Sequence, residues 1–218
     1  MTTIPVPAAD LAMNRPGEQA RRQAMLAREA APVRSVLARL VGVHNEERAW
    51  RIGADGEELV ARSLARLVRK APRWRVLHSV PVGDRGSDID HVVIGPGGVF
   101  TLNAKHHPGA RIWVAGNTLM VNGARQPYVR NCRHEAERAS RLLTAACGFD
   151  VPATGVVVPV RVDRIDIRER PADVQVMDRR ALVRWLRRLP EVLDDTAVEA
   201  VHAQARLAST WAPQTRKR

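Results

Sequence analysis

Residues 88–105 read DIDHVVIGPGGVFTLNAK, and this stretch decides the fold. An apolar run with an acidic start occupies 88–95, a Pro-Gly-Gly turn follows at 96–98, and a second apolar run occupies 98–105. Two apolar runs that flank a glycine-rich turn are typical of a β-hairpin, whose strands pair antiparallel. The stretch therefore predicts two neighbouring strands in the core of a sheet.

The predicted hairpin carries polar side chains at its open end. Residues two apart in a strand point to the same face, so Asp88 and Asp90 share a face, and Asn103 and Lys105 share a face. Carboxylates and other oxygen ligands hold hard divalent cations such as Mg²⁺, and a bound cation lowers the pKa of a water molecule. A lysine beside such a site can orient the water or stabilise developing charge. Asp88 is interpreted as a loop residue that caps the strand in preference to a metal ligand, and an alternative interpretation makes Lys105 an ordinary strand-end charge.

Lys105 is unusual in this chain because lysine is rare. The 35 basic residues include three lysines, which are Lys70, Lys105 and Lys217. Lys70 and Lys217 lie in arginine-containing clusters typical of exposed surface, whereas Lys105 ends an apolar strand. This isolation favours a functional role for Lys105.

Periodic apolar patterns on both sides of the hairpin predict an α/β fold, with a central mixed sheet flanked by helices. The expected order is helix, three strands, helix, strand, strand, helix. The helices are expected at 45–72, 131–148, 179–193 and 195–210, the strands at 74–82, 88–95, 98–105, 155–162 and 172–178, and a further short hairpin at 111–123.

The chain divides into a main domain and two flanking segments. Residues 1–44 are expected to form an N-terminal extension, of which 1–16 are Pro- and Ala-rich and loosely attached or disordered. Residues 17–42 show helical periodicity and either lie against the main domain or bind a partner or a second copy. The main domain is expected at 45–190, followed by a C-terminal helix and basic tail at 191–218.

Composition indicates a basic, globular protein. The 218 residues carry a net charge of +12 with 45% hydrophobic residues, and a basic body favours polyanions such as nucleic acid. The alternative is a solvated, arginine-rich surface. No apolar run approaches the roughly 18 residues of a membrane span, no secretion signal is visible, and Cys132 and Cys147 are expected as reduced thiols. We therefore expect a soluble, cytoplasmic protein without a membrane partner.

Four stretches occur in a particular order: GADGEELVARSL at 53–64, DIDHVVIGPGGVF at 88–100, LNAK at 102–105 and QPYVRNCRHEAERASRLL at 126–143. In combination they resemble the nuclease-related domain (NERD) family of the PD-(D/E)XK restriction-endonuclease-like superfamily. The resemblance implies an αβββαβ nuclease core. It also implies that Glu57 is the helix glutamate, Asp90 the metal-binding aspartate and Lys105 the catalytic lysine. Without the resemblance, Glu57 would be interpreted as an ordinary acid near a helix N-terminus.

The chain departs from the family pattern at two positions. Asn103 stands where the superfamily motif has Asp or Glu, and its amide oxygen can coordinate a cation but brings no negative charge. Arg130 precedes Asn131 where many family members have Gln. Arg130 suits a phosphate contact, and together with Arg125 and Arg133 it is a candidate nucleic-acid contact.

The resemblance and the residues together predict a Mg²⁺- or Mn²⁺-dependent deoxyribonuclease, which hydrolyses phosphodiester bonds of DNA with metal-activated water. Its catalytic residues would be Glu57, Asp90, Asn103 and Lys105, of which the first three would be metal ligands. One alternative is a catalytically inactive nucleic-acid-binding module on the same fold, because Asn103 replaces the motif carboxylate. Another is an interaction protein whose N-terminal helices dock a partner. The expected partner is nucleic acid, DNA rather than RNA, and a homo-oligomer is left open.

Overall fold

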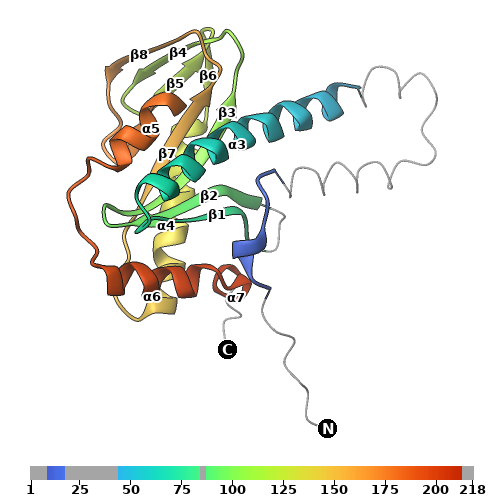
Figure 1. Cartoon of the computed structure of the whole chain (residues 1–218). Helices are drawn as coiled ribbons and strands as arrows, with labels where there is room; N and C mark the ends of the chain where they lie inside the picture. The colour runs from blue at the N-terminus through green and yellow to red at the C-terminus, as the bar shows by residue number, and fades with distance from the viewer. Residues whose placement is uncertain (1–8, 18–43, 84–86, 213–218) are drawn as a thin grey trace, which may run out of the picture.

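The computed structural model describes residues 9–17, 44–83 and 87–212, and shows a central sheet with helices on both faces and a smaller sheet at one end (Figure 1). This arrangement confirms the predicted α/β class. The helices expected at 17–42 lie outside the described residues, apart from Gly17. In the described part of the chain, no helix is both long enough and apolar enough to cross a membrane.

The central sheet has five strands in the order β1-β2-β3-β7-β9. Strands β1, β2 and β3 pair antiparallel, and β7 and β9 extend the sheet in parallel from β3. The predicted hairpin is confirmed, since Gly95 pairs with Gly98 across its turn. The strands are β1 (Arg75–Val82), β2 (Ser87–Gly95), β3 (Gly98–His106), β7 (Ala153–Val160) and β9 (Val174–Val176).

Helices cover both faces of this sheet, and alternate residues of the strands face the two layers. In β2, Val93 packs in one apolar cluster while Val92 and Ile94 pack in the other. Leu64 and Leu67, on the helix of residues 44–70, are fully buried against the sheet, and the burial of each contributes about 1.5–3 kcal/mol to the stability of the fold. The first layer is α3 (His44–Lys70) and α5 (Arg179–Leu186), and the second is α4 (Tyr128–Cys147), α6 (Asp195–Ala205) and α7 (Ala208–Trp211).

Helix α3 continues through Gly53 and Gly56 without a break, and Gly56 serves a close approach to β3. A Cβ atom at position 56 would lie 2.9 Å from the Cβ of His106. The side chain is therefore absent where the helix crosses the end of β3, and α3 can lie directly on that strand. The expected order αβββαβ is confirmed in α3, β1, β2, β3, α4 and β7.

A second sheet of four strands, in the order β6-β5-β4-β8, was predicted only in part. The hairpin of β4 and β5 was expected, whereas the parallel partner of β4, β8, was not. Strand β8 reads RIDIRE, a short and mostly charged stretch that lacks the apolar run of a core strand. The strands are β4 (Arg111–Ala115), β5 (Thr118–Val121), β6 (Ala124–Gln126) and β8 (Arg164–Glu169).

Residues 9–17 pack onto the domain, which differs from the expected loose attachment of residues 1–16. They include a short 3₁₀ helix, η1 (Leu11–Met13), whose Leu11 is buried in the apolar cluster of α4, α6 and α7. Asp10 pairs with Arg206, and the backbone N–H of Leu11 donates to the Arg206 carbonyl at 2.8 Å. The sequence could not indicate this docking, because the partners lie near the other end of the chain.

Candidate active site

The hairpin and helix α3 bring the predicted catalytic residues together. The pairing of β2 with β3 ends at His91 and Leu102, so Asp90 lies just past the last paired position. There the Asp90 carboxylate accepts a 2.7 Å hydrogen bond from the backbone N–H of Ala104. This bond fixes Asp90 beside the segment of β3 that carries Asn103 and Lys105.

Glu57 reaches the same cluster from the middle of α3. Its side chain is 8% exposed, and its Oε2 accepts a 2.9 Å hydrogen bond from the backbone N–H of Gly17. Burial, followed by the nearby carboxylates of Asp90 and Asp88, raises the pKa of Glu57 to about 8. The docked N-terminal segment therefore contacts a predicted catalytic residue directly.

Asp90 and Asp88 form the acidic part of the cluster on β2. Burial raises the pKa of Asp90, and the positive charge of Lys105 and the N–H of Ala104 act in the opposite direction. Burial and then Asp90 raise the pKa of Asp88 to about 6. Asp88 lies inside β2 and not in a loop, so the interpretation of Asp88 as a loop cap is wrong.

Glu135 is a fourth carboxylate that the sequence did not single out. It projects from α4, and both of its oxygens accept hydrogen bonds from Asn103 Nδ2, at 2.9 and 3.0 Å. Burial is the main cause that raises its pKa to about 7, and the charge of Asp90 adds to this. The sequence did contain a signal for Glu135, because it lies on α4 beside the buried stripe of Cys132 and Ala139 and so faces the sheet. Glu135 places negative charge beside the position where the superfamily motif has an acid.

Asn103 has one oxygen that remains available. The side chain is 7% exposed, and among the described residues its Oδ1 has no hydrogen-bond partner. A buried carbonyl oxygen without a donor is suited to a water molecule or a hard cation. No group of three or more His, Cys, Asp and Glu side chains in the described chain is arranged to hold a metal ion by itself. Any ion here would therefore need the amide oxygen of Asn103 and water as well as carboxylate.

Lys105 supplies positive charge to this acidic cluster. It counteracts the raised pKa values of Glu57, Asp88 and Glu135. Its Nζ lies 5.3 Å from the centre of the Tyr128 ring, within the range of a cation–π contact. The hydroxyl of Tyr128, the first residue of α4, lies 3.0 Å from His107 Nε2. Lys105 is thus held between the acids and an aromatic ring.

The three predicted nucleic-acid contacts lie elsewhere on the surface. Arg133 makes an ion pair with Asp173, so its guanidinium is already occupied. Arg130 and Arg125 are exposed, on α4 and β6 respectively. No described contact joins these arginines to the carboxylate cluster, and their role in binding remains a prediction.

The fold is consistent with a restriction-endonuclease-like core, and it brings Glu57, Asp90 and Lys105 close together. The sequence profile of the family described as nuclease-related domain (NERD) matches residues 52–160, which contain all four predicted catalytic residues and Glu135. The chain belongs to this family, and its membership is consistent with the PD-(D/E)XK superfamily.

The chain is similar to a curated protein but to no solved structure. An uncharacterized protein of Bacillus anthracis is 34% identical over 95 residues, which are 39% of this chain and 43% of that protein. The match therefore spans less than half the length of this relative. No solved structure matches the chain significantly.

Proposed function

We propose that this protein hydrolyses phosphodiester bonds of DNA in a reaction that depends on a divalent cation. Membership of a nuclease-related family supports the reaction class. The observation that carries the proposal is the pair of hydrogen bonds between Asn103 and Glu135, because they place a carboxylate beside the substituted motif position. The negative charge that Asn103 lacks is then supplied from α4.

The oxygen donors of the cluster fit a hard cation, Mg²⁺ or Mn²⁺. Asp90 and the unpartnered Oδ1 of Asn103 would hold it, with Glu57 and Glu135 adding negative charge around it. Such ions commonly keep several water ligands, which suits a site with few protein donors. When bound, a divalent cation supplies positive charge to a phosphoryl group and lowers the pKa of water.

The other residues have roles that follow from their contacts. The N–H of Ala104 fixes the orientation of the Asp90 carboxylate. Lys105 brings a positive charge that can stabilise the phosphate as negative charge develops on it. The ring of Tyr128 limits where the Lys105 ammonium can lie. Charge stabilisation of this kind is commonly the largest single contribution of an enzyme to rate.

A second candidate function is a nucleic-acid-binding module without catalysis. Asn103 supports it, since the motif carboxylate is absent at that position. Two measurements separate the candidates: titration calorimetry with Mn²⁺, and nicking of supercoiled plasmid with Mg²⁺, Mn²⁺ or chelator. The hydrolysis proposal predicts that the wild type binds Mn²⁺ and nicks plasmid, and that Asp90→Ala does neither. The binding module predicts DNA binding without nicking under any of these conditions.

A further inference from the structure

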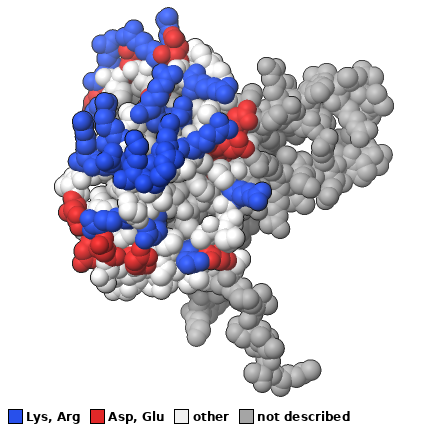
Figure 2. Space-filling view, viewed as in Figure 1, with Lys and Arg blue, Asp and Glu red and all other residues white. Residues whose placement is uncertain are grey.

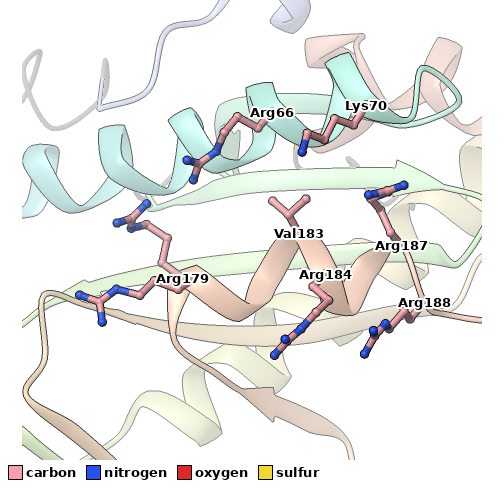
Figure 3. A pocket seen from close by; sticks show the side chains of 8 residues that line it. Arg66, Lys70, Arg179, Val183, Arg184, Arg187 and Arg188 are labelled. Atoms are coloured by element: carbon pink, nitrogen blue, oxygen red, sulfur yellow. The ribbon is translucent and has the colours of Figure 1, made fainter.

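A groove of about 660 Å³ lies between the end of α3 and helix α5, outside the carboxylate cluster (Figure 3). Among the described residues that line it, Val183 is apolar and every other side chain is cationic. The cations are Arg66, Lys70, Arg179, Arg180, Arg184, Arg187 and Arg188. A band of Lys and Arg covers the face of the molecule where these two helices lie (Figure 2).

The cations form rows on the two facing helices. Arg66 and Lys70 are one turn apart on α3, and Arg180, Arg184 and Arg188 follow at the same four-residue interval along α5 and the turn after it. Like charges four residues apart on a helix each cost about 0.2–0.5 kcal/mol. The arrangement is therefore unfavourable until an anion is present between the rows.

No acidic side chain is among the described residues that line the groove, although the charge of Asp178 offsets part of the repulsion at Arg179. Within the described residues, none of its seven cations makes an ion pair, whereas Arg73 and Arg75 nearby pair with acids of the α6 region. The buried Ser63 Oγ accepts hydrogen bonds from Arg66 at 3.1 Å and from Arg179 at 3.2 Å. This hydroxyl holds guanidinium groups of both helices beside each other, so their charges face the same space.

The lining chemistry indicates the class of ligand. Arginine forks match phosphate oxygens with two parallel hydrogen bonds, and they are less strongly hydrated than lysine. The lining residues that the structure describes include no aromatic side chain on which a base could stack, so recognition would be of the backbone and not of the bases. At the helical rise of about 1.5 Å per residue, the row from Arg180 to Arg188 extends about 12 Å, which suits a chain of phosphates better than a single one.

We propose that the groove between α3 and α5 binds the phosphate backbone of a nucleic acid and positions it for the carboxylate cluster. The proposal rests on the proposed function in taking nucleic acid as the partner. Helix α3 connects the two sites, because Glu57 precedes Arg66 and Lys70 by about 14 and 20 Å along its axis. The groove is thus a separate positioning surface and not part of the hydrolytic site.

Fluorescence anisotropy with a short labelled DNA duplex, in chelator, tests the groove without catalysis. The test variant is Arg184→Glu/Arg188→Glu, and the matched control is Arg141→Glu/Arg168→Glu, which changes the net charge equally at exposed arginines outside the groove. At about 0.1 M salt each phosphate contact contributes about 8-fold in affinity through counterion release. The groove variant should therefore bind about 60-fold more weakly, and its salt slope should fall by about 2.

The control variant should lose less than about threefold, because its arginines are not expected to touch phosphate. Equal losses in both variants, or no loss in the groove variant, would overturn the proposal. So would preferential binding of inorganic triphosphate by the wild type. The neutral pair Arg184→Gln/Arg188→Gln should show a weaker defect in the same direction, with unchanged thermal unfolding.

A rival surface is tested in the same assay by Arg125→Glu/Arg130→Glu. If only this double variant loses DNA binding, the DNA backbone binds at Arg125 and Arg130, and the proposal that it binds in the groove is overturned. Mn²⁺ binding by calorimetry separates this proposal from the proposed hydrolysis. If the groove variant binds Mn²⁺ normally but binds DNA weakly, both the groove and the ion site are supported. If the wild type binds DNA through the groove but takes up no Mn²⁺, only the proposed hydrolysis is contradicted.

Discussion

Replacing Glu135 with Gln tests whether α4 supplies the negative charge that Asn103 lacks. Gln keeps the size of the side chain and one oxygen for Asn103 Nδ2, where Glu135 now offers two at 2.9 and 3.0 Å. The principal change is the charge beside the proposed ion. Groups that contact a metal ligand from outside typically alter metal affinity about 10- to 100-fold, or about 1.4–2.8 kcal/mol. We expect the Kd for Mn²⁺ to rise by that factor.

The same substitution should not destabilise the metal-free protein. Burial, with Asp90 nearby, raises the pKa of Glu135 to about 7, so its ionisation at about pH 8 costs the folded state on the order of 3 kcal/mol. Gln avoids this cost. The free energy of unfolding in chelator at about pH 8 should therefore stay equal or rise in Glu135→Gln, whereas a purely structural role of Glu135 predicts a fall.

Restoring the charge on the strand completes this test. Asn103→Asp in the Glu135→Gln background returns a carboxylate to the motif position, and the Kd for Mn²⁺ should approach that of the wild type. Calorimetry measures the affinity, and denaturant unfolding measures the stability. An unchanged Kd in Glu135→Gln, or a loss that Asn103→Asp fails to restore, refutes the charge argument. Wild-type protein that takes up no divalent ion refutes it at the first step.

Three further predictions concern the lysine, the pH dependence and the N-terminal segment. Lys105→Ala should bind Mn²⁺ normally but nick plasmid about 10²- to 10³-fold more slowly, and joint loss of both would contradict its role on the phosphate. In chelator, the free energy of unfolding should fall as the pH rises from about 6.5 to about 8, because Glu57, whose pKa burial raises to about 8, keeps a proton that the unfolded chain has released, and Glu135 does the same up to about pH 7. Below this window His78 and His91, whose pKa values burial lowers, act in the opposite direction. Glu57→Gln should flatten this profile, and an equally steep one would count against it. Leu11→Ala should cost about 2–4 kcal/mol in denaturant unfolding, whereas the exposed Met13→Ala should be neutral; equal effects would show that the segment is not docked.

The central part of the site could be predicted because it is local in the sequence. Two strands joined by a two-residue turn pair side by side, so the proximity of Asp90 to Asn103 and Lys105 follows from the hairpin and from strand periodicity. Glu57 required the family resemblance, because nothing in its own helix indicates which strand it meets.

The features that were missed depend on contacts between distant parts of the chain. Glu135 is one of two acids on α4, and its role beside the motif position becomes visible only when Asn103 is seen to lie opposite. Strand β8 has no apolar run because it pairs with β4 in the smaller sheet, and not in the core. Leu11 docks near Arg206, at the far end of the chain.

The arginine groove illustrates the same limit. In the sequence, each helix shows cations spaced four residues apart. Either row alone would be interpreted as ordinary exposed surface. Only the packing of α5 beside α3 brings Arg179 and Arg66 to one hydroxyl, that of Ser63. Net charge indicated that an anion would bind but could not say where.

The rate of nicking of supercoiled plasmid in Mn²⁺ tests the account's central claim most directly. Wild type, Asp90→Asn and Lys105→Ala should be purified in parallel, so that any contaminating nuclease affects all three equally. The account predicts nicking by the wild type that chelator abolishes and that falls at least 100-fold in both variants. Nicking that persists unchanged in Asp90→Asn and Lys105→Ala, or that is absent from a wild type shown to bind Mn²⁺, would contradict it.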